Sequence, residues 1–399
     1  MKTKVAVIFG GRSTEHEISV ISAVQTINAI DTEKYDVIPV YITKKGHWLT
    51  GEVLTDLKQY KNPDKLAEVT EEVFFKGIYG DNNLYVAKPK GLFKKQEIKD
   101  KIDVVFPVLH GSNGEDGVFQ GLIETIGIPY VGCDVLSSAV GMDKIFMKMI
   151  LKSCSIPVVD FVWFTDKGWF SDEDARAEEI EKELGYPVIV KPANLGSSVG
   201  IGCATNRDEL RKKVADAIKY SSRIIVEKMI VNMKEINCSV LGDCNDCITS
   251  VLEEPLKTGD LLSYEDKYLG GTKGSEGMSA SSKRIPAELD EKVTEKIKEY
   301  AAGTFRALSC NGVSRVDVMM DTDTGKIYVN EINTIPGSLS YYLWDATGIN
   351  FTKLTDRLID LALKRNREKD SKITSYDHNI FNMGSLAGAK GGVKGGKLK

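Results

Sequence analysis

The sequence predicts an α/β protein of three consecutive units, the first of them built on a parallel sheet. Three observations predict this architecture. Strand and helix patterns alternate over residues 1–132, a second strand–helix unit with a glycine-rich loop covers 133–226, and antiparallel strand patterns occur within 227–370. A chain of 399 residues is also too long for one ordinary hydrophobic core.

The first unit begins with an apolar strand, Lys4–Phe9, which ends in a pair of glycines and is followed by a helix to about Ile30. Further buried strands are predicted at Val37–Ile42 and Val104–Leu109, and the second of these ends in His110-Gly111. Ligands of open α/β sheets gather at the carboxyl ends of the strands. Both glycine turns therefore mark candidate ligand sites.

In the second unit we expect a helix after Val135 and a strand at Tyr186–Val190, followed by the glycine-rich loop. The third unit is predicted to contain antiparallel strands around 235–253, a helix near 286–308, a hairpin and a closing helix near 351–365. The polar, glycine-bearing stretch 261–285 lacks a period, which is typical of a functional lid or of disorder. Residues 371–399 are basic and polar, so we expect a disordered tail.

The predicted hairpin carries acids on both strands. A turn-type sequence, residues 321–325, joins the strand around Asp317 to the strand that contains Glu331 and Asn333. Facing carboxylates repel, and an unpaired buried charge costs several kcal/mol, which a divalent cation would remove. These three residues offer the oxygen ligands of magnesium, an ion that usually shares its coordination with substrate phosphates. A solvated edge hairpin is the alternative, but the neighbouring valines are poor surface residues.

The glycine-rich loop, residues 194–200, follows a predicted strand that ends in Lys191-Pro192. Glycines let backbone N–H groups approach phosphate oxygens, and Lys191 adds a positive charge beside them. Ser197 and Ser198 lie within the loop. The spacing does not fit the Walker A pattern, and a plain surface turn is the alternative. Together with a magnesium hairpin, the loop indicates nucleotide binding.

A second candidate nucleotide contact follows the apolar run 224–226, where Glu227 and Lys228 end a predicted strand. Glu227 is suited to accept from an adenine amino group or a ribose hydroxyl, and Glu235 lies at a spacing that would reach a ribose. An exposed strand end is the alternative.

Composition disfavours several classes of protein. Hydrophobic residues make up 42% and charged residues 28%, as in soluble globular proteins. The net charge of −4 and the lack of a basic block outside the tail argue against nucleic acid as a partner. We expect no membrane association and no signal peptide. The seven cysteines are scattered, and the lone Cys244–Cys247 pair is interpreted as a reduced hairpin turn, which favours a cytoplasmic location.

The motifs, taken in order, resemble the ATP-grasp superfamily. They are Lys144, Lys191, the glycine-rich loop, Glu227-Lys228, Glu235, Arg315 with Asp317, and Glu331 with Asn333. Within that superfamily, residues 10–19, 109–111, 114–117, 142–144 and 265–268 are similar to those of D-alanine–D-alanine ligases. The resemblance runs from about residue 4 to 365.

This resemblance implies an ATP-grasp fold of three α/β domains, with the nucleotide between the central and C-terminal domains. It implies a ligase that phosphorylates the carboxylate of one D-alanine with ATP and then joins the acylphosphate to a second D-alanine, making D-alanyl-D-alanine for peptidoglycan. The implied cofactors are ATP and Mg²⁺, with Mn²⁺ as an alternative ion. The family is commonly dimeric, so we expect a homodimer.

The resemblance also assigns roles to single residues. Glu15 would hold the ammonium group of the first D-alanine with His110 nearby, and Arg315 and the backbone N–H of Gly337 would stabilise the oxyanion. Ser197 would orient Glu15 and Tyr268. The remaining roles are ATP-phosphate binding by Lys144, Lys191 and Lys267, and magnesium binding by Asp317, Glu331 and Asn333.

The segment after Gly337 departs from the family pattern. It is shorter than usual, and either Ser338 or Ser340 replaces the family's second-substrate serine, or neither does. D-serine and D-lactate are therefore alternatives to D-alanine as acceptor. Another ATP-grasp carboxylate–amine ligase is a further alternative, and a regulatory protein that binds ATP without catalysis is the rival from another class.

Overall fold

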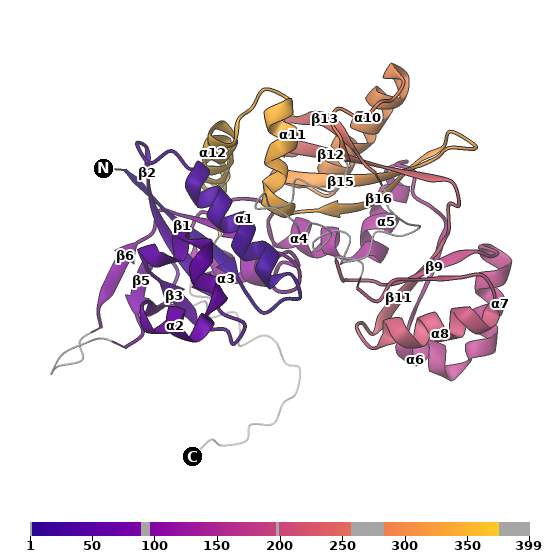
Figure 1. The fold of residues 1–399 in the computed structure, drawn as a ribbon, viewed down its shortest axis with the longest axis horizontal. Helices are drawn as coiled ribbons and strands as arrows, with labels where there is room; N and C mark the ends of the chain where they lie inside the picture. The colour runs from indigo at the N-terminus through magenta and orange to yellow at the C-terminus, as the bar shows by residue number, and fades with distance from the viewer. Residues whose placement is uncertain (1, 89–95, 197–198, 257–282, 375–399) are drawn as a thin grey trace, which may run out of the picture.

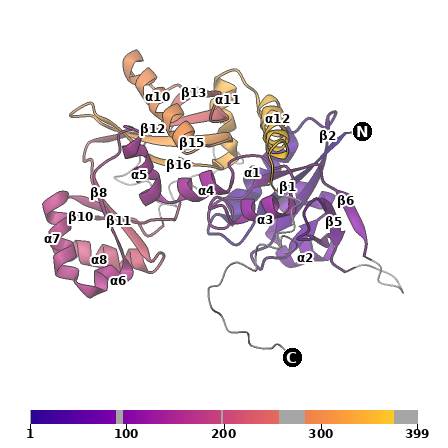
Figure 2. The same ribbon diagram turned by 180° about the vertical axis from the view of Figure 1, so that it is seen from behind.

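The computed structural model describes residues 2–88, 96–196, 199–256 and 283–374, which form three sheets flanked by helices (Figure 1). Figures 1 and 2 place the N-terminal sheet and the central sheet at opposite ends of the molecule. Helices α4 (Val135–Met142) and α5 (Lys144–Ser153) lie between them in both views. In these described ranges, no helix is both long and apolar enough to cross a membrane.

The N-terminal sheet has seven strands in the order β6-β5-β4-β3-β2-β1-β7. The strands are β1 (Thr3–Gly10), β2 (Tyr35–Ile42), β3 (Trp48–Thr50), β4 (Glu71–Phe75), β5 (Asn83–Val86), β6 (Ile98–Lys101) and β7 (Val104–Val108). Strands β2, β1 and β7 are parallel, as predicted. Strands β3 to β6 pair antiparallel, and the sequence pattern did not predict them. Short turns, such as the one between β2 and β3, can join only antiparallel neighbours.

Helices cover the parallel part of this sheet on both faces. Those of the N-terminal unit are α1 (His16–Ala29), η1 (Glu52–Thr55), η2 (Leu57–Lys61), α2 (Pro63–Glu68) and α3 (Val118–Ile126). Successive side chains of β1 enter different cores, with Val7 on one face and Ile8 on the other. A strand that is buried on both faces explains the continuous apolar run at the start of the sequence.

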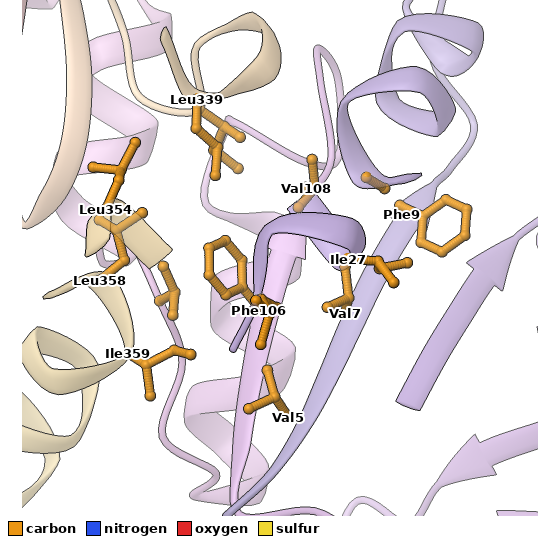
Figure 3. Close-up of a cluster of buried hydrophobic side chains, with 14 of the residues drawn as sticks. Val5, Val7, Phe9, Ile27, Phe106, Val108, Leu339, Leu354, Leu358 and Ile359 are labelled. Atoms are coloured by element: carbon orange, nitrogen blue, oxygen red, sulfur yellow. The ribbon is translucent and has the colours of Figure 1, made fainter. Parts of the chain in front are cut away.

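The last helix of the chain packs against this first unit. Helix α12 (Phe351–Asp370) contributes Leu358 to a core that also holds Phe106 of β7 and Ile27 of α1 (Figure 3). The helix ends five residues later than the expected end near 365. Residues from 375 onward, which hold most of the predicted tail, lie outside the described part of the chain.

The central sheet is antiparallel, with the strand order β10-β9-β11-β8. Its elements are β8 (Phe161–Thr165), α6 (Asp166–Ser171), α7 (Glu173–Glu183), β9 (Val188–Pro192), β10 (Gly202–Ala204), α8 (Arg207–Ile218) and β11 (Arg223–Lys228). The strand predicted at Tyr186–Val190 therefore begins and ends two residues later. Pro187 has no N–H to give to the ladder. The glycine-rich loop connects β9 to β10.

The C-terminal sheet is antiparallel, with the order β14-β13-β12-β15-β16. Its elements are β12 (Met233–Gly242), β13 (Cys247–Pro255), β14 (Lys283–Arg284), α10 (Glu291–Ala307), β15 (Gly312–Asp321), β16 (Ile327–Asn333), η3 (Gly337–Ser340) and α11 (Tyr341–Ala346). The predicted hairpin is formed by β15 and β16, and Asp317 pairs with Glu331 as expected. Cys244 lies in the turn between β12 and β13, and Cys247 is the first residue of β13. Both are free cysteines.

The hydrophobic cores do not follow the linear units of the chain. Met147 and Leu151 of α5 lie in the predicted central unit, yet they join the core of the C-terminal sheet with Phe305 and Val316. Helix α12 belongs in the same way to the N-terminal core. The boundaries at 132 and 226 stay a prediction about the sequence, while packing combines elements from neighbouring units.

Candidate functional site

The acidic hairpin brings together Arg315, Asp317 and Asn333. The Arg315 guanidinium donates to both carboxylate oxygens of Asp317, over 2.6 Å from Nε and 2.8 Å from Nη2. Asn333 Nδ2 donates to Asp317 Oδ2 over 3.0 Å. Burial opposes the charge of Arg315, but Asp317 outweighs it and raises the pKa of Arg315 well above its usual value. Alternation along both strands puts these side chains on one face.

Two lysines from the central region reach the other strand of the hairpin. Lys144 Nζ lies 3.1 Å from Glu331 Oε2 and donates to the carbonyl of Leu195 over 2.8 Å. Lys191 Nζ donates to Asn330 Oδ1 over 3.2 Å. The register of β15 and β16 shifts here, so that Asn330 is an extra residue opposite β15. Strand β16 therefore meets both predicted phosphate lysines.

The donors of the hairpin suit a magnesium ion. Asp317 and Glu331 face each other across the ladder, and the amide oxygen of Asn333 is a third hard oxygen donor. Arg315 and Lys144 balance the two carboxylates. Among the described residues, no three or more His, Cys, Asp and Glu side chains are grouped to hold a metal ion. The hairpin is not such a group, because its donors are two carboxylates and one amide.

Glu15 occupies the N-cap position of α1, and its carboxylate lies against two glycine loops. A methyl group at Gly196 would come within 2.8 Å of Glu15 Oε1, and one at Gly111 within 3.4 Å. Gly111 also has φ +72°, which favours glycine. The buried Glu15 carboxylate therefore lies between the turn after β7 and the glycine-rich loop. This is the proximity that the predicted roles of Glu15 and the loop require.

His110 is buried and neutral. Burial lowers its pKa to about 4. His110 Nε2 lies 3.0 Å from Ser22 Oγ, and the same oxygen accepts from the backbone N–H of Ser338 over 2.9 Å. His110 thus connects the turn after β7 to η3 through Ser22.

The η3 turn holds three consecutive residues in the left-handed region. Ser338, Leu339 and Ser340 have φ values of +49°, +53° and +51°. Each such residue costs roughly 1–3 kcal/mol, and strain of this kind is concentrated at functional sites. The hydroxyl of Ser340 is buried without a hydrogen-bond partner among the described residues. The strain and the unpartnered hydroxyl occur in the segment that departs from the family pattern.

Glu115 links two loops of the site, the turn after β7 and the segment after β16, through hydrogen bonds. Its Oε2 accepts from Gly111 N over 2.8 Å and its Oε1 accepts from Ile335 N over 3.0 Å. Burial first, and then the charge of Glu15, raise the pKa of Glu115 to about 8. The carboxyl group therefore holds the turn beside His110 against the segment that leads to Gly337.

Comparison with known proteins identifies the family. Residues 4–133 match the model "D-ala D-ala ligase N-terminus", and residues 150–360 match "D-ala D-ala ligase C-terminus". The chain belongs to the D-alanine–D-alanine ligase family. It is therefore an ATP-dependent ligase with the ATP-grasp fold, as the resemblance predicted.

Individual members of this ligase family match most of the chain. The D-alanine–D-alanine ligase of Thermosipho melanesiensis is 43% identical over 379 residues, which cover 95% of this chain and 98% of the relative. Among solved structures, the VanG D-Ala:D-Ser ligase of Enterococcus faecalis has a TM-score of 0.77 at 34% identity and covers 91% of this chain and 100% of its own. The D-alanine–D-alanine ligase of Coxiella burnetii has a TM-score of 0.74 at 31% identity, covering 92% and 96%.

Two further predicted residues of the ligase lie on β11 and β12. Lys228 is exposed at the end of β11, and Glu235 is half-buried on β12 opposite Met319. Four of the predicted site residues lie outside the described residues, namely Ser197, Ser198, Lys267 and Tyr268. Their roles, like the other residue roles, stay predictions.

Glu227 has neighbours that the sequence analysis did not anticipate. Its carboxylate is buried and contacts Lys191 and Lys148. The predicted contact of Glu227 with adenine or ribose stays a prediction.

Lys148, Asn330 and Glu115 were missed as site residues. For Lys148 a signal was present, because it follows Lys144 by one helical turn.

The N-terminal unit also contains a cavity of about 990 Å³, lined by residues such as Tyr41, Tyr60 and Leu49. Among the residues that the structure describes, none of those predicted to bind ATP, metal or amino acid lines it. The cavity therefore lies outside the candidate site.

Replacing Glu115 with alanine is expected to lower the free energy of unfolding by roughly 2–6 kcal/mol, because two buried N–H groups each lose an acceptor at about 1–3 kcal/mol. Urea denaturation followed by circular dichroism measures the change. Glu115→Gln keeps one acceptor oxygen, so a loss about half as large is expected. Equal stability of wild type and both variants would contradict the bridging role.

Proposed function

We propose that the chain joins two molecules of D-alanine, with ATP as the energy source, to make D-alanyl-D-alanine for peptidoglycan. The observation that carries this proposal is the convergence of Lys144 and Lys191 on the acidic hairpin. Glu15 lies beside the glycine-rich loop, which follows β9, the strand that contains Lys191. The proposed nucleotide site and the proposed amino-acid site are therefore adjacent.

In the first step, a carboxylate oxygen of D-alanine attacks the γ-phosphorus of ATP, and the bond to ADP breaks. Phosphoryl transfer depends mainly on positioning and on neutralising charge. Lys144 and Lys191 supply positive charge at the phosphates. Asp317, Glu331 and Asn333 would hold Mg²⁺, with Mn²⁺ as an alternative, and the bound ion would neutralise further phosphate charge.

In the second step, the amine of the acceptor D-alanine attacks the acyl carbon. The bond from that carbon to the phosphate oxygen breaks, and the amine passes a proton to the phosphate that leaves. Negative charge develops on the acyl oxygen, for which the Arg315 guanidinium and the N–H of Gly337 are the proposed donors. Glu15 holds the ammonium group of the first D-alanine.

D-Alanine is the favoured acceptor, because the curated relatives carry the name D-alanine–D-alanine ligase. D-serine is retained as an alternative, since the structural relative VanG is named a D-Ala:D-Ser ligase. ADP release measured with D-alanine alone, and with D-alanine paired with D-serine or D-lactate, tests the acceptor. We further propose a homodimer, and use of ATP favours a cytoplasmic location.

Glu15→Gln is expected to raise the KM for the first D-alanine by about 10–100-fold, because a charge-assisted hydrogen bond of about 1.5–3 kcal/mol is weakened. The KM for ATP should change by less than about threefold, since Glu15 lies on the amino-acid side. Steady-state kinetics of D-alanine-dependent ADP release measure both constants.

Glu17→Gln is a matched control, because Glu17 lies in the same helical turn and pairs with the exposed Lys44. The control should leave both KM values unchanged. An unaltered D-alanine KM in Glu15→Gln would favour a first substrate without an ammonium group, and therefore another carboxylate–amine ligase.

A further inference from the structure

Lys148 is a buried lysine without an assigned role. It lies on α5, one turn after Lys144, and its side chain has no exposed surface. Its ammonium group lies 3.3 Å from Glu227 Oε1 and makes no hydrogen bond within the described part of the chain. Lysine is rarely buried without a strong reason, because its charge loses hydration.

The partner of Lys148 is shared with a predicted phosphate lysine. Glu227 is 2% exposed, and its second oxygen, Oε2, accepts from Lys191 Nζ over 2.8 Å. Burial alone would raise the pKa of Glu227, but Lys148 and Lys191 outweigh it and lower that pKa. Glu227 is therefore a buried carboxylate with one lysine at each oxygen.

This arrangement matters when ATP binds. The phosphates of ATP would draw Lys191 away from Glu227. A buried carboxylate that loses its only partner is strongly destabilised, because its charge is left uncompensated. With Lys148 in place, Glu227 retains a cation, and Lys191 is able to turn to the nucleotide at a lower cost.

We propose that Lys148 is a positioning residue for nucleotide binding, whose buried ammonium group balances Glu227 and leaves Lys191 free to pair with ATP phosphates. The inference rests on the nucleotide site of the proposed function. Burial lowers the pKa of Lys148 to about 8, with Glu227 acting against that shift, so the side chain remains mostly charged at pH 7. Lys148 acts through Glu227 and Lys191, because it is enclosed by protein.

The test combines two substitutions in a double-mutant cycle. Lys148→Met removes the charge and keeps an unbranched chain, and it is expected to weaken equilibrium binding of ATP with Mg²⁺ by 10–100-fold in isothermal titration calorimetry. The neutral amide in Glu227→Gln needs no balancing cation. In that background, Lys148→Met should change ATP affinity by less than threefold.

Lys152→Met is the matched control. Lys152 lies on the same helix one turn later, where its half-exposed side chain pairs with Asp160 over 3.6 Å. This control should bind ATP as the wild type does. Kinetics supply a second readout, because Lys148→Met should raise the KM for ATP while the D-alanine KM changes by less than threefold.

An equal loss of ATP affinity from Lys148→Met in both backgrounds would overturn the proposal, because it would mean that Lys148 supports the fold without acting through Glu227. If Lys148→Met alone does not fold, the comparison of Glu227→Gln with the double variant decides, and a loss of tenfold or more in that pair overturns the proposal.

ATP binding is measured without D-alanine. A wild type that binds ATP but shows no D-alanine-dependent ADP release would therefore contradict the proposed function alone.

Discussion

Replacing Glu331 with glutamine is expected to lower kcat by about 10³-fold while leaving the fold intact, since the variant loses a charged oxygen of the proposed Mg²⁺ site and the partner of Lys144. The amide keeps the shape of the side chain but coordinates Mg²⁺ weakly. The Glu331 side chain is 21% exposed, and Lys144 keeps its hydrogen bond to the Leu195 carbonyl when the charge of Glu331 is removed. ADP release at saturating ATP and D-alanine, measured across a Mg²⁺ titration, gives kcat and the apparent metal affinity.

Asp323→Asn provides the control for the hairpin. Asp323 is exposed in the turn between β15 and β16, away from the predicted metal ligands. It should leave kcat unchanged, and both variants should melt within about 3 °C of the wild type. Near-normal turnover of Glu331→Gln at saturating Mg²⁺ would rule out Glu331 as a metal ligand.

Arg315→Lys is expected to lower kcat by about 10²–10³-fold, the loss typical when one donor to a developing oxyanion is removed. Lysine keeps the positive charge but cannot reproduce the planar fork that Arg315 presents to Asp317. The KM for ATP should change little, because Lys144 and Lys191 are the proposed phosphate contacts. Single-turnover measurement of peptide formation separates the chemical step from product release.

Arg284→Lys is the matched control, because Arg284 pairs with Glu254 on the neighbouring strands β14 and β13. It should be close to wild type in kcat. A uniform loss of stability in Arg315→Lys, with kcat preserved in the folded fraction, would show that the guanidinium serves only to hold Asp317.

Short-range rules predicted the hairpin and the first parallel strands. The turn residues predicted that Asp317 would face Glu331, and the register confirms this pairing, although it depends on the shift at Asn330. The apolar run after Lys4 predicted a strand, and the structure confirms the strand and buries it on both faces. These features depend on neighbours that are close along the chain.

Other features required partners that are distant in sequence. Glu115 bridges Gly111 and Ile335, and no local pattern indicates an acceptor for an N–H group 220 residues away. The register shift at Asn330 is equally invisible in the strand pattern, although it brings that residue to Lys191. Strands β3 to β6 were not predicted, because their stretch of sequence has weak periodicity and their pairing depends on the geometry of the turns between them.

By itself, the sequence determined the ligase family, the glycine-rich loop and the facing acids of the hairpin, since these depend on residue type and on spacing along the chain. The tertiary structure alone decided that α12 completes the N-terminal core, and that Glu227 lies between Lys148 and Lys191. The reason is physical: burial and charge pairing depend on which segments meet in space, and only packing of the whole chain brings them together.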